Sequence, residues 1–287
     1  LDVVTTAGQD WTHPPFAGDA AGGFIWGRGA LDMKGGVAMM LAAVMRAAKD
    51  PSTLPGDVVI ALLADEEDGG KFGARFLVDE HPDLFGGVRF ALGELGGFTV
   101  HLGGRRIYPV MVAEKQACWI RCTVRGPGGH GSLRHTGGAM ARLSRLLATL
   151  DRRRLPVHIT EPARLQVEAL AAAVGGVRGA VLRRLLNPAL TDRVLGALGP
   201  SGRTLDPILH NTVSATVVAG GEKLNVIPSE VSVDLDGRVL PGLSDQDLVA
   251  ELRALLGPEV EVQVVGYIPG PPSPDLGLFD LLARTLE

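Results

Sequence analysis

Acidic residues at three separate points in the first hundred positions are the side chains best suited to chemistry. Asp32 lies in the glycine-rich segment 27–36, the acidic run 65–67 ends one apolar stretch, and Glu94 follows another. Acidic residues at strand ends, backed by glycines, are how α/β hydrolytic enzymes hold divalent metals. A lone carboxylate in a loop is usually only solvated, whereas three such sites predict one shared metal-binding cleft.

The elements that must position these carboxylates alternate between helix and strand. The pattern predicts a helix over about 34–49, an apolar strand over 57–64, a helix over about 71–79 and a strand over 88–92. A continuous apolar strand of this kind is typical of a sheet that is covered on both faces. The alternation therefore predicts a mostly parallel, layered sheet, with the acidic residues at the carboxyl ends of its strands.

The middle of the chain has a different pattern, in which alternating strands surround amphipathic helices. Strands are predicted at about 116–125, 212–218, 230–238 and from 260, and helices at about 138–150 and from 244. Ser244, with Asp247 three residues later, resembles a capping box that opens the second helix. The order β-α-β-β-α-β predicts a ferredoxin-like module, interrupted by a helical insertion at about 152–205.

The fold class expected from these patterns is α/β: a first domain with a mostly parallel layered sheet, and an inserted ferredoxin-like domain. The family resemblance described below implies that the first is a catalytic domain and that the second serves for dimerisation or as a lid. Residues 1–113 would form the N-terminal part of the catalytic domain, 114–267 the inserted domain, and 268–287 a return into the catalytic domain. The Pro-rich segment 269–274 is typical of a linker before that return.

The composition argues against several classes of partner. A net charge of −4 over 287 residues gives no basic surface that would favour nucleic acid or an anionic membrane. The apolar runs are far shorter than the ~20 residues of a membrane span. Cys118 and Cys122, four apart on one predicted strand, are expected to be buried thiols rather than a disulfide.

The two ends of the sequence predict a fragment. Leu1 opens an apolar run without an initiator Met, and Glu287 stops within a helical pattern. We expect sequence to be missing at both ends. A cytoplasmic location is expected, with a signal peptide left open as an alternative.

Eight short segments together carry a resemblance to a known family. They are, in order, residues 1–4, 11–16, 27–36, 65–67, 94–97, 129–132, 225–228 and 236–242. Each segment is weak alone, but their order on the two-domain layout resembles the M20 metallopeptidase family. That family includes acetylornithine deacetylase, succinyl-diaminopimelate desuccinylase, aminoacylase, carnosinase-like dipeptidases and glutamate carboxypeptidase.

The resemblance implies two Zn²⁺ per subunit in the full-length parent protein, with Co²⁺ or Mn²⁺ as alternatives. Asp32 would bridge the two metals, Glu67 would bind one and Glu94 the other. Two family histidine ligands are expected outside this sequence, one directly before Leu1 and one beyond Glu287. The fragment by itself is therefore expected to bind metal weakly or to be inactive.

The resemblance also implies catalytic and substrate-binding roles. Glu66 would be the general base toward a metal-bridging water, and Asp2 would orient the missing histidine ligand. His130 would reach the active site of a partner subunit and stabilise the oxyanion, so a homodimer is expected. Arg238, with Asn225 assisting, would bind a substrate carboxylate.

These roles predict zinc-dependent hydrolysis of an amide or peptide bond in a small substrate with a free carboxylate. Whether the substrate is an N-acyl amino acid or a short peptide stays open, and so does a non-catalytic relative that acts as a binding or assembly module. Each site residue also has a plainer alternative. Asp32 could be a helix N-cap, the run 65–67 a solvated face, and Arg238 a surface ion-pair residue.

Overall fold

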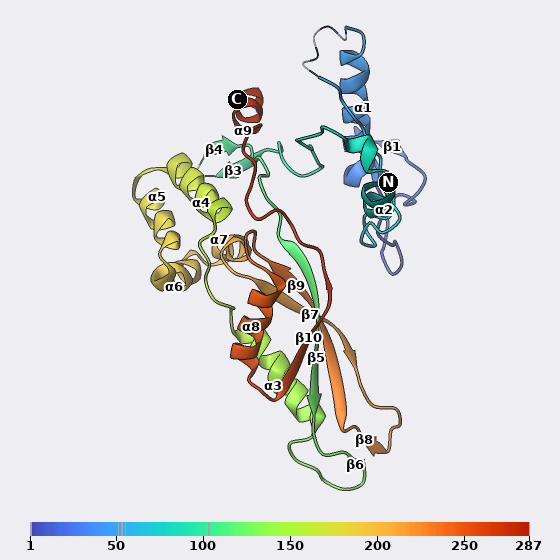
Figure 1. Ribbon diagram of the computed structural model, residues 1–287, viewed down its shortest axis with the longest axis vertical. Helices are drawn as coiled ribbons and strands as arrows, with labels where there is room; N and C mark the ends of the chain where they lie inside the picture. Colours follow the sequence, from blue (N-terminus) through green and yellow to red (C-terminus); the bar gives the residue numbers. More distant parts are fainter. Residues whose placement is uncertain (1, 51, 53, 55, 103, 287) are drawn as a thin grey trace. The chain divides into compact units, whose positions relative to one another are not determined.

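The computed structural model describes residues 2–50, 52, 54, 56–102 and 104–286. The chain forms two compact units, Leu1–Leu95 and Gly96–Glu287. The second unit contains a four-stranded sheet, a pair of helices that pack on it, and a separate group of short helices (Figure 1).

The sheet of the second unit is antiparallel throughout. Its strands are β5 (Gln116–Arg125), β7 (Thr212–Ala219), β9 (Glu230–Val239) and β10 (Val260–Tyr267). Their order across the sheet is β10-β5-β9-β7, so the two longest strands lie in the centre. Each central strand alternates buried and exposed side chains, because successive residues of a strand point to opposite faces.

One face of this sheet packs against helices α3 (Ala139–Arg152) and α8 (Asp245–Leu256). The β5 side chains on that face, Cys118, Ile120 and Cys122, are all 0% exposed. The capping box predicted for α8 is confirmed. The Ser244 side chain accepts the Asp247 N–H, and the Asp247 carboxylate accepts the Ser244 N–H at 2.7 Å.

The helical insertion lies between α3 and β7 and has its own small core. It consists of α4 (Glu161–Val174), α5 (Gly176–Arg183), η4 (Arg184–Leu186), α6 (Pro188–Leu198), α7 (Pro200–Leu205) and η5 (Asp206–Ile208). Leu185, Leu195 and Leu209 are at most 1% exposed in that core. Figure 1 shows these helices at one end of the sheet, and the short pair β6 (Gly129–His130) and β8 (Val226–Ile227) at the other end.

The remaining segments of the second unit are short. β3 (Val100–Leu102) pairs with β4 (Arg105–Ile107), and α9 (Phe279–Leu286) ends the described chain. Among the described residues, none of the helices combines the length and the apolar character that crossing a bilayer would require.

The first unit holds the acidic residues on irregular backbone between short elements. These elements are β1 (Ala20–Ala21), β2 (Phe24–Ile25), η1 (Ala30–Gly35), α1 (Gly36–Ala47), α2 (Ala74–Glu80) and η3 (Pro82–Phe85). The helices predicted over 34–49 and 71–79 correspond to α1 and α2, each with a later start.

The parallel sheet predicted for this part is not formed among the described residues. Residues 57–64 and 88–92 make no strand pair there, and every pair that is present is antiparallel. An apolar run shows that a segment favours burial, but a ladder also needs hydrogen-bonding neighbours along both edges. The α/β class itself stands, because helices and sheets both occur.

The two core thiols predict a loss of stability in alkaline solution. Burial, and then the charge of Asp245, raises the pKa of Cys118 to about 11. Burial, and then the charge of Asp234, raises the pKa of Cys122 to about 12. In the unfolded chain both thiols ionise near pH ~8.5. Above that pH the unfolded state loses protons that the folded state keeps, so the free energy of unfolding falls as pH rises.

We expect this loss to reach about 1.4 kcal/mol per pH unit for each thiol between roughly pH 9 and 11. Urea unfolding at several pH values, compared with the Cys118→Ala/Cys122→Ala double variant, isolates the effect. Equal pH slopes for the two proteins would contradict the thiol assignment.

Candidate functional site

The carboxylate of Asp2 holds the acidic run in place. Its two oxygens accept the backbone N–H groups of Glu66 and Glu67, each at 3.0 Å. Burial acts to raise the pKa of Asp2, but these backbone hydrogen bonds outweigh it and lower the pKa below its usual value. The ionised side chain of Asp2 therefore holds the backbone of both glutamates, although Asp2 and Glu66 are 64 residues apart in the sequence.

The acidic run lies in a tight turn rather than on an extended strand end. Asp65 has a φ of 64°, which is the left-handed region that residues with a side chain rarely adopt. Its carboxylate accepts the Phe72 N–H at 2.8 Å and so closes the loop. The turn and the Asp2 clamp therefore set the directions of Glu66 and Glu67.

Close backbone packing brings the neighbouring segments to this turn. A Cβ on Gly73, directly before α2, would lie 1.9 Å from the Ala64 carbonyl oxygen. Gly29, with a φ of 79°, passes so near Val3 that a Cβ would lie 2.8 Å from its Cγ1. These two glycines allow α2 to pack on the run before Asp65, and the Asp32 loop to pack beside the Asp2 segment.

Asp32 does not act as a helix N-cap. The N-cap of α1 is Gly35, and no side chain makes a capping hydrogen bond there. Asp32 lies in the irregular turn η1, where its own φ of −112° and ψ of 100° are not helical. The helix-cap alternative for this residue is therefore excluded, and its carboxylate needs another explanation.

Four carboxylates lie close enough to Glu66 to affect its ionisation. Burial raises the pKa of Glu66, and so do, in decreasing order, the negative charges of Glu94, Glu67, Asp2 and Asp32. The structure thus gathers around Glu66 the four other carboxylates to which the family resemblance gives a role. They come from positions as far apart as 2 and 94.

The gathered carboxylates bear on the binding of a divalent metal. Within the part of the chain that the structure describes, no three His, Cys, Asp or Glu side chains close into a metal-binding group. Like charges oppose closer approach unless a cation lies between them. Carboxylate oxygens are ligands that suit divalent ions. In charge and donor type the cluster therefore fits a divalent cation, with Asp32, Glu67 and Glu94 as candidate ligands.

Histidine ligands are not contributed by the described part of this unit. His13 has its Nδ1 3.1 Å from the Asp19 carboxylate and stacks on Trp26. This arrangement accounts for His13 as a packing residue of the β1–β2 region.

His130 and Asn225 are brought together at one end of the sheet in the second unit. β6 and β8 pair so that His130 faces Val226, and the Gly131 N–H donates to the Asn225 carbonyl at 2.8 Å. The Ser132 N–H donates to His130 Nδ1 at 3.3 Å. This contact favours the imidazole tautomer with its hydrogen on Nε2, which makes Nε2 a donor.

Arg238 lies far from that pair within one chain. β9 begins at Glu230, five residues after Asn225, and Arg238 is near its far end. Roughly 26 Å of extended strand therefore separates Glu230 from Arg238. The expected assistance of Arg238 by Asn225 is not possible within a single chain.

The guanidinium of Arg238 already has a carboxylate partner. Its Nε and Nη2 lie 3.0 Å from the two oxygens of Asp236. Asp236 was missed by sequence reasoning, although its position two residues earlier on the same strand is a usable signal, because such residues share one face. The pair orients the guanidinium and, within the described part of the chain, leaves Nη1 for another acceptor.

Comparison with known proteins places the whole chain in one family. The family model described as peptidase family M20/M25/M40 matches residues 1–287. Probable carboxypeptidase S-like 2 of Dictyostelium discoideum is 29% identical over 300 residues, covering 100% of this chain and 56% of that protein. Aminoacylase-1 of Sus scrofa is 30% identical over 253 residues, covering 87% of this chain and 50% of that protein.

The chain spans about half the length of these curated relatives. Among solved structures, human carnosine dipeptidase 1 matches with a TM-score of 0.54 at 17% identity, over 98% of this chain and 63% of that chain. At this identity the structural match supports the fold alone. The family model covers every residue, and the chain therefore belongs to the peptidase family M20/M25/M40.

Proposed function

We propose that this chain is part of a metal-dependent hydrolase that cleaves an amide or peptide bond in a small substrate with a free carboxylate. N-acyl amino acids and short peptides are the two substrate classes. The observation that carries the proposal is the Asp2 clamp. The two carboxylate oxygens of Asp2 accept the backbone N–H groups of Glu66 and Glu67, each at 3.0 Å, and so hold the two residues side by side. Membership of the peptidase family supports the same reaction class.

The residues that would hold the metals are Asp32, Glu67 and Glu94. Two Zn²⁺ ions, or Co²⁺ or Mn²⁺, are proposed for the complete protein. When bound, such a pair supplies a shared water whose pKa falls toward ~7 and a positive charge for the developing oxyanion.

Glu66 moves the proton in this scheme. Its carboxylate accepts a proton from the attacking water while the water oxygen bonds to the carbonyl carbon. It then gives that proton to the amine nitrogen as the C–N bond breaks, which yields a carboxylic acid and an amine. Asp2 takes no part in the proton transfer and serves to hold the turn that carries Glu66.

His130 is proposed as the oxyanion donor. The contact with the Ser132 N–H leaves hydrogen on Nε2, which is the form that can donate to a negatively charged oxygen. A donor of this kind contributes ~10²–10³ in rate.

The distance between the two ends of β9 supports a homodimer. His130 and Asn225 would serve the active site of one subunit and Arg238 that of the other, because one chain cannot bring all three to one small substrate. We propose that the four-stranded sheet with α3 and α8 is the ferredoxin-like dimerisation and lid domain. A cytoplasmic location belongs to the same proposal.

Metal content and turnover together test this function in the intact protein. We expect about two divalent ions per chain, loss of amide hydrolysis after treatment with a chelator, and recovery when Zn²⁺ is restored. A panel of N-acetyl amino acids and dipeptides would separate a deacylase from a peptidase. Stable metal binding without hydrolysis of any member of the panel would favour the alternative, a non-catalytic relative that acts as a binding or assembly module.

A further inference from the structure

The sheet face opposite α3 and α8 carries a group of polar residues at the end where β9 finishes. Ala117 on β5 and Thr212 on β7 are the cross-strand neighbours of Arg238 on β9. Cross-strand neighbours point to the same face. On β5 this face is open: Trp119 is 39% exposed, whereas Cys118 on the other face is 0% exposed.

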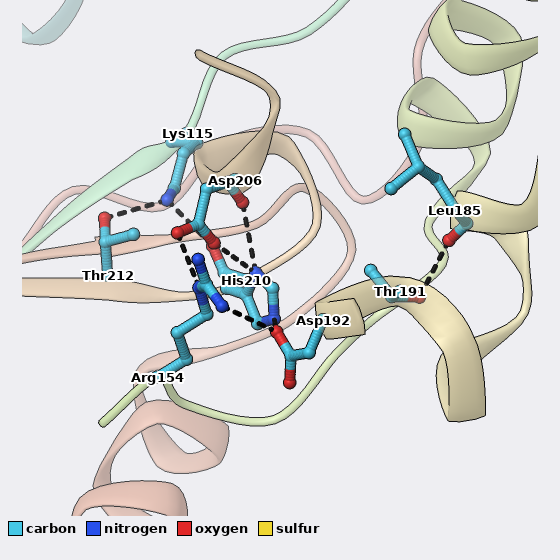
Figure 2. Close-up of polar contacts among 8 residues, drawn as sticks. All are labelled: Lys115, Arg154, Leu185, Thr191, Asp192, Asp206, His210 and Thr212. Atoms are coloured by element: carbon cyan, nitrogen blue, oxygen red, sulfur yellow. Dashed lines mark hydrogen bonds and ion pairs between the residues drawn. The ribbon is translucent and has the colours of Figure 1, made fainter. Parts of the chain in front are cut away.

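Lys115, just before β5, reaches across this face to the start of β7. Its ammonium group donates to the Thr212 hydroxyl at 2.9 Å and to the His210 carbonyl at 3.0 Å (Figure 2). An ammonium group has three hydrogens. Within the described residues these two bonds leave one N–H for another acceptor.

An ionic cluster around the buried His210 side chain fixes the acceptors that hold Lys115. His210 is 1% exposed, and its Nδ1 lies 2.6 Å from the Asp206 carboxylate. Arg154 donates to Asp206 of η5 at 2.8 Å and to Asp192 of α6 at 3.3 Å, and so joins two elements of the helical insertion (Figure 2). Because these contacts fix the backbone around His210, the ammonium group of Lys115 has a defined position.

The carboxylates near Lys115 are already paired with other positively charged groups. The charge of Arg238 is largely offset by its pair with Asp236, and Asp206 is already shared between Arg154 and His210. Burial lowers the pKa of Lys115 to about 8, with Asp206 opposing that change and Arg238 adding to it. Lys115 and Arg238 are thus close enough to repel, and a bound anion between them would relieve that repulsion.

We propose that Lys115 is a specificity-determining residue that donates its third N–H to the substrate carboxylate bound by Arg238. This inference rests on the proposed function. The substrate carboxylate would then be bound on the open face of the sheet by two charged groups, through Nη1 of Arg238 and Nζ of Lys115. A neutral amide at the same place could accept the same N–H but lacks the charge attraction, so it should gain much less from Lys115.

Direct binding tests the inference without turnover. In the intact protein carrying Glu66→Gln, calorimetry would compare N-acetylglycine with its neutral analogue N-acetylglycinamide. Adding Lys115→Met should weaken binding of N-acetylglycine by about 10–100-fold and weaken binding of the neutral analogue far less. The matched control Lys49→Met, at an exposed lysine of the first unit, should change neither affinity.

The pH profile supplies a readout that a merely structural lysine would not move. With Lys115 present, affinity for N-acetylglycine should fall as pH rises above about 8, because the amine loses its proton. With Lys115→Arg, which stays charged, the affinity should stay level to pH ~10.

Three outcomes would overturn the inference: no binding of N-acetylglycine to the Glu66→Gln protein, equal losses for the charged and neutral probes, or a level pH profile with Lys115 in place. The failure of the proposed function is a separate result. If the unmodified protein hydrolyses no amide while the binding results follow the expectation, the hydrolase proposal fails and the carboxylate site stands.

Discussion

We expect Glu66→Gln to lower kcat of the intact protein by about 10²–10⁴-fold, with little change in metal content. Gln is almost the same size as Glu but cannot accept a proton from water. The backbone N–H of residue 66 remains free to donate to Asp2, so the turn is preserved. The loss should therefore fall on the proton transfer and not on the fold.

The measurements for Glu66→Gln are kcat, KM and bound metal, taken on the same preparation. Glu80→Gln is a matched control, because it makes the same change on α2, outside the acidic run. A Glu66→Gln protein that retains normal kcat would defeat the general-base assignment. A protein that loses its metal together with its activity would instead make Glu66 a ligand.

The second large effect is expected for Asp2→Asn. The Asn amide has one carbonyl oxygen and one NH₂ group, so only one of the two N–H groups in the turn can keep its acceptor. The other N–H then faces a donor and loses its hydrogen bond. We expect kcat/KM to fall by about 10–100-fold, because Glu66 and Glu67 lose their fixed positions.

Amide hydrogen exchange checks this prediction independently of activity. Exchange at the backbone N–H of residues 66 and 67 should accelerate in Asp2→Asn, since both are hydrogen bonded to Asp2 in the unmodified chain. Asp10→Asn makes the same chemical change elsewhere in the first unit and should leave both amides protected. Unchanged exchange in Asp2→Asn would show that the clamp does not hold the turn.

Much of the second unit could be predicted because its signals are periodic. The alternation at 116–125 and 230–238 corresponds to the central strands β5 and β9. The pairing of Ser244 with Asp247 marked the start of α8. Such patterns report which side of an element is buried, and this depends only on neighbouring residues.

The first unit shows the limit of the same method. The apolar pattern at 57–64 indicates a segment that favours burial, yet no described segment pairs with it. Hydrophobicity is a property of a residue, whereas a parallel ladder depends on a neighbouring strand elsewhere in the chain. The parallel arrangement therefore could not be established from the pattern.

By itself, the sequence determined which residues are able to do chemistry: the carboxylates of Asp2, Asp32, Glu66, Glu67 and Glu94, and the family to which their order belongs. Only the tertiary structure decided that Asp2 clamps the acidic turn, that Asp236 pairs with Arg238, and that Lys115 lies beside that pair. Residue type and spacing are local and can be read along the chain. Hydrogen bonds such as that from Lys115 to Thr212 join positions 97 residues apart, so they depend on the path of the whole chain.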